Sequence, residues 1–109
     1  MTRRVTPEDH ELRAMSEAVL KAAVLHVAYE HGWIVYHGAM ILHNRPVRGS
    51  SVGYPDLTCA RDGEVVFLEL KTELGVLEMA QTVWMAALPA YHVIRPKDLA
   101  SGRVFEILG

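Results

Sequence analysis

The chain has 109 residues, of which 50% are hydrophobic and 22% are charged, and its formal net charge is −2. These values fit one folded domain, residues 1–109, and exclude a disordered chain. No apolar run approaches the roughly 18 residues of a membrane helix, and no apolar signal segment opens the chain. The single cysteine, Cys59, excludes an internal disulfide, so we expect a cytoplasmic protein. Because the net charge is small, a nucleic-acid partner would require a local basic patch.

The first predicted element is a helix over residues 6–31. Thr6 is a suitable N-cap, and Pro7 occupies the first helical position. Apolar residues recur at helical spacing as far as Gly32, which ends the helix. Residues 33–37, with the sequence WIVYH, are aromatic and β-branched and are therefore predicted to form a strand.

The middle of the chain loses this periodicity over residues 38–55, where we expect a long loop. The elements expected after it are strands over 56–61 and 64–71, a helix over 77–88 that Pro89 stops, a strand over 91–96, one helical turn over 97–101 and a last strand over 103–108. This order predicts an α/β domain in which helices flank a central mixed sheet.

The Asp62-Gly63 pair between two apolar strands favours a two-residue hairpin turn, which fixes the strand register. In that register Asp56 lies opposite Glu69, and opposed residues share one face of the sheet. Lys71 follows two residues after Glu69 and points the same way. A three-residue turn would instead send Asp56 to the opposite face.

Two opposed carboxylates repel each other, and removing them from water is costly unless their charge is compensated. A divalent cation would compensate them, because Mg²⁺ prefers a few carboxylate oxygens and keeps its other positions for water and phosphate oxygens. Lys71 would then hold an attacking water or stabilise the transition state. The plainer alternative is an ion pair of Glu69 with Lys71 at the strand end, with Asp56 as a turn residue.

Two more polar residues fall on predicted apolar helix faces. Gln81 lies in a stripe that also contains Leu77, Trp84, Met85 and Leu88, and Glu17 shares a face with Leu20, Val24 and Val27. A buried, hydrogen-bonded amide is the plainer interpretation of Gln81. An ordinary i,i+4 pair with Lys21 is the plainer interpretation of Glu17.

Pro55-Asp56 followed by Glu69-Leu70-Lys71 resembles the PD-(D/E)XK nuclease signature. More narrowly, the chain is similar to the VRR-NUC family over residues 16–96. The matching residues are Gly53, Tyr54, Pro55, Asp56, Glu69, Leu70, Lys71, Gly75, Leu77 and Gln81. The resemblance implies an α-β-β-β-α-β restriction-endonuclease-like core and a DNA endonuclease that depends on Mg²⁺, with Mn²⁺ as a substitute.

Short, free-standing members of that family, often from phages, act as dimers on branched DNA. The chain resembles this kind, which implies a homodimer that resolves branched DNA such as Holliday junctions in a bacterial or phage-infected cell. Two other functions stay open. One is a sequence-reading or general DNA endonuclease, and the other is a non-catalytic DNA-binding module on the same fold.

The resemblance also implies a role for each matching residue. Asp56 and Glu69 would bind the metal, together with the backbone carbonyl of Leu70. Lys71 would orient or activate the attacking water. The full implied catalytic set is Asp56, Glu69, Lys71, Gln81, which would support the lysine or a phosphate, and Glu17, which would reach the metal through water.

Four arginines are the predicted DNA contacts. Arg45 and Arg48 lie in the 38–55 loop, where neighbouring glycine and serine let the backbone approach a phosphate. Arg61, near the hairpin tip, and Arg95 are further candidates. The small net charge departs from the basic character expected of a DNA-binding protein.

Three further interpretations concern metals, thiols and assembly. The six histidines lack the spacing of a zinc site, and no group is placed to activate Cys59 as a nucleophile.

The residues of the 77–88 helix outside its main stripe include Met79, Val83, Ala86 and Ala87. Because apolar residues surround so much of this helix, we expect it to contribute to a homodimer.

Overall fold

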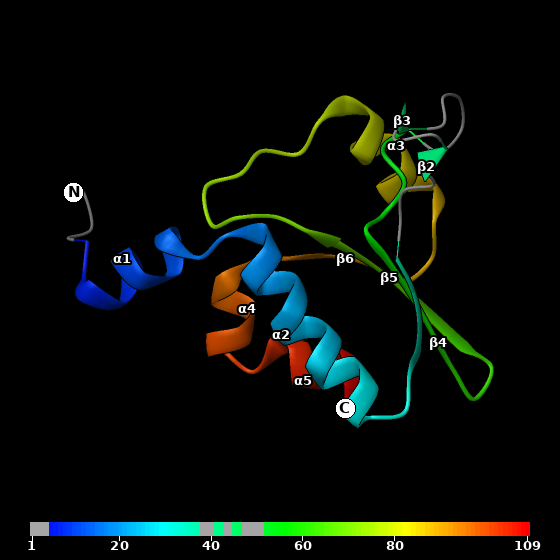
Figure 1. Cartoon of the computed structure of the whole chain (residues 1–109), viewed down its shortest axis with the longest axis horizontal. Helices are drawn as coiled ribbons and strands as arrows, with labels where there is room; N and C mark the ends of the chain where they lie inside the picture. The colour runs from blue at the N-terminus through cyan, green and yellow to red at the C-terminus, as the bar shows by residue number, and fades with distance from the viewer. Residues whose placement is uncertain (1–4, 38–40, 43–44, 47–51) are drawn as a thin grey trace.

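The computed structural model describes residues 5–37, 41–42, 45–46 and 52–109. Its centre is a four-stranded mixed sheet with the strand order β1-β4-β5-β6 (Figure 1). These strands span β1 Ile34–His37, β4 Leu57–Arg61, β5 Glu64–Leu70 and β6 Tyr91–Ile94. The first three are antiparallel neighbours, and β6 runs parallel to β5. The predicted α/β class with a mixed sheet is therefore confirmed.

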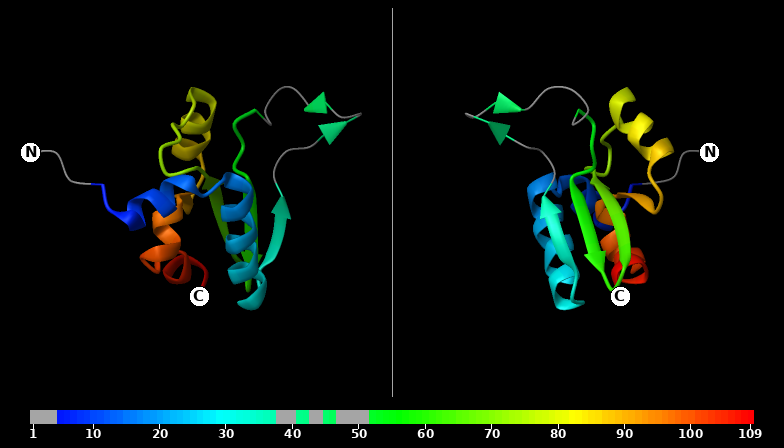
Figure 2. Two further views of the ribbon diagram at one scale, coloured as in Figure 1. Left: turned by 60° about the vertical axis from the view of Figure 1, so that its left-hand side comes forward. Right: turned by 90° about the vertical axis from the view of Figure 1, so that its right-hand side faces the viewer.

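Five helices accompany the sheet within the described ranges: α1 Pro7–Ala14, α2 Glu17–Glu30, α3 Met79–Ala87, α4 Pro96–Ala100 and α5 Arg103–Leu108. Figure 2 shows α2, α4 and α5 on one side of the sheet and α3 beyond the end at which β5 finishes. The hydrophobic core lies between the sheet and this helical layer. Its buried members include Leu20 and Val24 of α2, Leu68 of β5 and Leu108 of α5. None of the helices in the described ranges is long and apolar enough to cross a membrane.

The β4–β5 hairpin has the predicted register. Leu57 pairs with Leu68, and the ladder runs to Arg61 opposite Glu64. The turn has two residues, and both Asp62 and Gly63 have positive φ, at 51° and 79°. A two-residue turn of this kind matches the right-handed twist of the strands, which is why an Asp-Gly pair favours it.

The expected single helix over residues 6–31 is wrong, because the structure has two helices. Thr6 caps α1 as predicted, and its side chain accepts a hydrogen bond from the backbone of Asp9. However, Met15 is extended, and Ser16 caps α2 by accepting a hydrogen bond of 3.2 Å from the backbone N–H of Val19. A serine hydroxyl that accepts a hydrogen bond from a free N–H stabilises the start of a helix. The chain can therefore begin a second helix here instead of extending the first one.

The expected last strand over residues 103–108 is also wrong, since these residues form α5. Val104 and Leu108 are buried one helical turn apart, and Ile107 packs beside them. The indole N–H of Trp33 donates a hydrogen bond of 2.7 Å to the carbonyl of Leu108. Spacings of three and four residues mark a helical face, and this signal outweighs the β-propensity of a short apolar run.

The 77–88 helix is shorter than expected, and its apolar stripe is not part of the core. No residue of α3 is buried against the described chain, and Met85 is 40% exposed. The ring centres of Trp84 and Tyr54 lie 5.0 Å apart in an edge-to-face arrangement. The indole N–H of Trp84 donates a hydrogen bond to the carbonyl of Val52. The helix therefore packs against the segment before β4 rather than against the core.

The long loop expected over residues 38–55 contains a small pair of strands, β2 Ile41–Leu42 and β3 Arg45–Pro46. The chain then enters β4 through Gly53, whose φ is +78°. A Cβ at this position would lie 2.5 Å from the backbone carbon of Ala80, which is too close for any side chain. Gly53 therefore allows α3 to pack directly against the segment that carries Asp56.

Candidate active site

Glu69, near the end of β5, is the central residue of the candidate site. It is only 2% exposed, although its neighbours Leu68 and Leu70 point to the core on the other face of the sheet. Its Oε1 accepts a hydrogen bond of 2.8 Å from the side-chain N–H of Gln81. Its Oε2 is buried and has no hydrogen-bond partner within the described part of the chain. A buried carboxylate oxygen without a partner is unfavourable, so this atom is available for a ligand.

Asp56 lies beside Glu69, as the hairpin register predicts. It immediately precedes β4, and its Oδ2 accepts a hydrogen bond of 2.8 Å from the backbone N–H of Leu70. This bond holds the Asp56 carboxylate against the end of β5. The two predicted metal-binding side chains are thus brought together by the strand pairing and by one backbone donor.

The pKa of Glu69 is raised from its ordinary value of 4.5 to about 8. Burial is the largest cause, because it disfavours the charged form, and the charge of Asp56 acts in the same direction. The positive charge of Lys71 opposes these effects. The pair therefore retains a proton near neutral pH, and a bound cation would displace that proton.

Lys71 follows β5 directly and is half-buried. Its backbone N–H donates a hydrogen bond of 3.0 Å to the carbonyl of Ile94, so the residue continues the pairing of β5 with β6. A Cβ at Gly75 would lie 2.9 Å from Oγ1 of Thr72 and 3.5 Å from Cδ of Lys71. The glycine therefore allows close packing against Thr72, while the lysine side chain would be only in ordinary contact with a Cβ.

Gln81 connects the site to the start of α3. Its Oε1 accepts a hydrogen bond of 2.8 Å from the backbone N–H of Glu78, which fixes which end of the amide is the acceptor. The N–H end then faces Glu69. The family resemblance implies support for the lysine or a phosphate, and in the structure the Gln81 amide donates its hydrogen bond to the Glu69 carboxylate.

Glu17 is exposed in the first turn of α2. The described ranges contain no group of three or more His, Cys, Asp or Glu side chains arranged to hold a metal. Glu17 is therefore not brought together with Asp56 and Glu69 in this structure. A metal here would bind two carboxylates and complete its shell with water, phosphate or a carbonyl such as that of Leu70.

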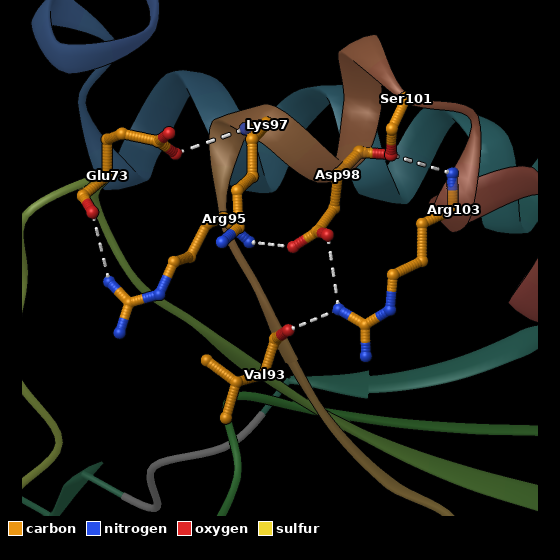
Figure 3. Close-up of polar contacts among 7 residues, drawn as sticks. All are labelled: Glu73, Val93, Arg95, Lys97, Asp98, Ser101 and Arg103. Carbon is orange, nitrogen blue, oxygen red and sulfur yellow. Dashed lines mark hydrogen bonds and ion pairs between the residues drawn. The ribbon is translucent and has the colours of Figure 1, made fainter. Parts of the chain in front are cut away.

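Arg95 has three partners in the segment after Lys71. One nitrogen of its guanidinium donates hydrogen bonds to the carbonyls of Thr72 and Gly75, at 2.8 and 2.7 Å, and to that of Glu73 at 3.3 Å. Figure 3 shows the side chain reaching Glu73 and the surrounding contacts of Asp98 and Arg103. Arg95 therefore fixes the path of the chain behind the candidate site, and its predicted contact with DNA stays a prediction.

Arg61 also has partners within the chain. Its guanidinium lies 4.2 Å from the centre of the Trp33 ring and donates hydrogen bonds to the carbonyls of His31 and Gly109, at 2.9 and 3.2 Å. Arg48 and the side chain of Arg45 lie outside the residues whose placement is described. The DNA contacts predicted for these three arginines stay predictions.

Cys59 is fully buried on β4, as expected for a small apolar residue. Burial raises the pKa of its thiol to about 11, so the side chain stays protonated at neutral pH. This protonation argues against a thiolate nucleophile.

Tyr91, the first residue of β6, is a candidate that sequence reasoning missed. Its hydroxyl is buried and has no hydrogen-bond partner among the described residues. Burial raises the pKa of Tyr91 to about 12, and the charges of Glu69 and Asp56 add to this effect. A parallel neighbour such as β6 has no hairpin turn to set its register, so no local pattern indicates that Tyr91 lies near the carboxylates.

Comparisons of the chain with protein-family models, with curated proteins and with solved structures find no significant match. The resemblance to VRR-NUC nucleases therefore depends on the motif residues and on the geometry that they adopt.

Proposed function

We propose that the chain is a metal-dependent DNA endonuclease of the PD-(D/E)XK type, similar to the VRR-NUC nucleases. The observation that carries this proposal is the buried Glu69 carboxylate, which has one oxygen held by Gln81 and the other without a partner in the described residues. Asp56 lies beside it, and Lys71 follows on the same strand end. In a structural ion pair, we would expect both buried carboxylate oxygens to have hydrogen-bond partners.

The residues fit a hard divalent cation such as Mg²⁺ or Mn²⁺. Oxygen donors suit such ions, and two carboxylates leave most coordination positions for water and phosphate. The raised pKa of Glu69 is consistent with such a site, because burial disfavours its charged form and the charge of Asp56 adds to this effect. When bound, the metal would polarise the scissile phosphate and lower the pKa of a bound water.

The chain's own residues would prepare the site for this chemistry. Gln81 holds one oxygen of Glu69, and the backbone N–H of Leu70 holds one oxygen of Asp56, so both carboxylates are oriented before a substrate arrives. Lys71 would place its ammonium group near the attacking water and the phosphate. Groups fixed in advance stabilise a transition state without reorganising during the reaction.

Branched DNA is the substrate that we propose, on the basis of the resemblance. One chain offers one Asp56–Glu69 pair, so cutting two strands would require two copies held by symmetry. Arg45 and Arg48 are the proposed phosphate contacts. A sequence-reading or general endonuclease is the alternative within the same chemistry.

A cleavage panel tests the proposal. Four-way junctions, forks, flaps and linear duplexes of the same sequences are incubated with the protein in Mg²⁺, in Mn²⁺ and in chelator. We expect metal-dependent cleavage with preference for branched substrates. Equal cutting of linear duplex would favour the general endonuclease. Binding without cleavage under every condition would favour a non-catalytic module and would overturn the proposal.

A further inference from the structure

Two side-chain atoms of the described residues are buried without a hydrogen-bond partner, Oε2 of Glu69 and the hydroxyl of Tyr91. They lie on neighbouring parallel strands, because Phe67 pairs with Tyr91 and Glu69 pairs with Val93. Side chains of paired residues share a face, as do those two positions apart along a strand. Glu69 and Tyr91 therefore project from the same face of the sheet.

The two groups are also close enough to interact electrostatically. The charges of Glu69 and Asp56 both raise the pKa of the Tyr91 hydroxyl, in addition to the effect of burial. The hydroxyl therefore stays protonated at neutral pH. It can donate a hydrogen bond as well as accept one.

Each unpaired group has a cost. A buried polar group without a partner destabilises a protein by about 1–3 kcal/mol. Two such groups lie on the face of the sheet that carries Asp56 and Glu69, which points to a ligand that they share. A cation alone would satisfy Oε2 of Glu69, but it would leave the O–H donor of Tyr91 without an acceptor. A cation that keeps water in its shell would satisfy both.

We propose that Tyr91 is a positioning residue of the cation site, whose hydroxyl forms a hydrogen bond with a water molecule bound to a divalent cation at Asp56 and Glu69. The inference rests on the metal site of the proposed function and adds a second strand, β6, to it. Because the hydroxyl is buried, a water in the cation's shell is a better partner than a phosphate of the DNA backbone. Partners in this position orient the ligands of a metal and tune its affinity.

The test compares Tyr91→Phe with the wild-type protein, using Mn²⁺ binding in the absence of DNA. Electron paramagnetic resonance of free Mn²⁺ gives the dissociation constant directly. We expect the variant to bind Mn²⁺ about 10-fold more weakly, which is the low end of the range for outer partners of metal ligands. Tyr36→Phe is the matched control, because Tyr36 is 53% exposed on β1, and we expect its Mn²⁺ affinity to equal that of the wild type.

Thermal unfolding in chelator provides a second readout. Tyr91→Phe should unfold at the wild-type temperature or above it, because the change removes a buried hydroxyl without a partner. Lower stability in chelator would show that the hydroxyl has a structural partner, and this result would contradict the inference.

The outcomes separate the inference from the proposed function. Wild-type Mn²⁺ affinity in Tyr91→Phe, together with a loss of binding in Glu69→Gln, would overturn the role of Tyr91 and leave the metal site intact. Absence of Mn²⁺ binding by the wild-type protein would overturn both. Weaker binding in Tyr91→Phe but not in Tyr36→Phe would support the inference.

Discussion

The side-chain amide of Gln81 donates a hydrogen bond of 2.8 Å to one oxygen of Glu69, while the other oxygen is buried with no partner in the described residues. The amide is itself oriented by the backbone of Glu78, so the carboxylate is held at one oxygen and open at the other. A carboxylate held in this way presents one oxygen to a cation without losing its orientation.

The two carboxylates are expected to be essential for cleavage and dispensable for folding. Asp56→Ala and Glu69→Ala should each reduce Mg²⁺-dependent cleavage by about 100-fold or more, since each removes a group that would stabilise the transition state through the metal. The fold should survive, because each change removes a carboxyl group whose removal from water is costly. Cleavage rates and circular dichroism measure the two effects, with Glu64→Ala on the exposed hairpin as a control. Full activity in the double variant would contradict the proposed function.

The stability of the cation-free protein is expected to fall as the pH rises. Glu69 has a folded-state pKa of about 8, above its ordinary value of 4.5, so the folded state holds a proton that the unfolded state releases first. Its contribution to stability is therefore complete below about pH 4.5 and is lost as the pH passes 8. Urea unfolding in chelator should show this decline in the wild type and a smaller one in Glu69→Gln. Parallel profiles for the two proteins would show that Glu69 is not the group responsible.

Mg²⁺ should reverse this loss of stability at alkaline pH. A ligand that binds only the folded state stabilises it by about 2.7 kcal/mol when its concentration is 100 times its dissociation constant. Binding to Asp56 and Glu69 favours their charged forms, so the stabilisation should grow with pH and disappear in Glu69→Gln. Thermal unfolding with and without Mg²⁺ measures it. Equal stabilisation of the variant would place the cation elsewhere.

The hairpin and its carboxylates were predictable because they depend on local rules. Asp62-Gly63 set the turn, the turn set the register, and the register brought Asp56 to Glu69. What could not be predicted depends on contacts between distant segments. At the end of the chain a short apolar run fits a strand by propensity and a helix by the spacing of Val104 and Leu108, and packing against α2 decides for the helix. Tyr91 was missed for the same reason, since its register with β5 follows from the crossover through α3 and not from a turn.

The intrachain contacts of Arg95 lead to another prediction. An arginine at the end of a strand is consistent with a DNA contact, but its guanidinium is committed to the carbonyls of Thr72, Glu73 and Gly75. Arg95→Met should therefore lower the free energy of unfolding by about 1–3 kcal/mol, because it leaves three partly buried carbonyls without their donor. The salt dependence of DNA binding should stay unchanged, whereas loss of a phosphate contact would reduce its slope by about one unit. A reduced slope with unchanged stability would instead support the predicted contact of Arg95 with DNA.

The last prediction is that two copies of the chain associate through α3. Met79 and Val83 lie one turn apart on this helix, and their exposed fractions are 83% and 63%. Side chains of this size gain about 1.5–3 kcal/mol each when fully buried, so a second copy that covers them would be favoured. Light scattering at micromolar concentration should report a dimer for the wild type.

Met79→Glu combined with Val83→Glu should give a monomer of unchanged fold, because neither side chain contributes to the core. The matched control is Ile34→Glu on β1, which removes an apolar residue that is 77% exposed on a different element and should leave the dimer intact. The monomeric variant should nick one strand of a four-way junction and fail to cut both in one binding event. A wild-type monomer that cuts both strands at once would show that the symmetry argument is wrong.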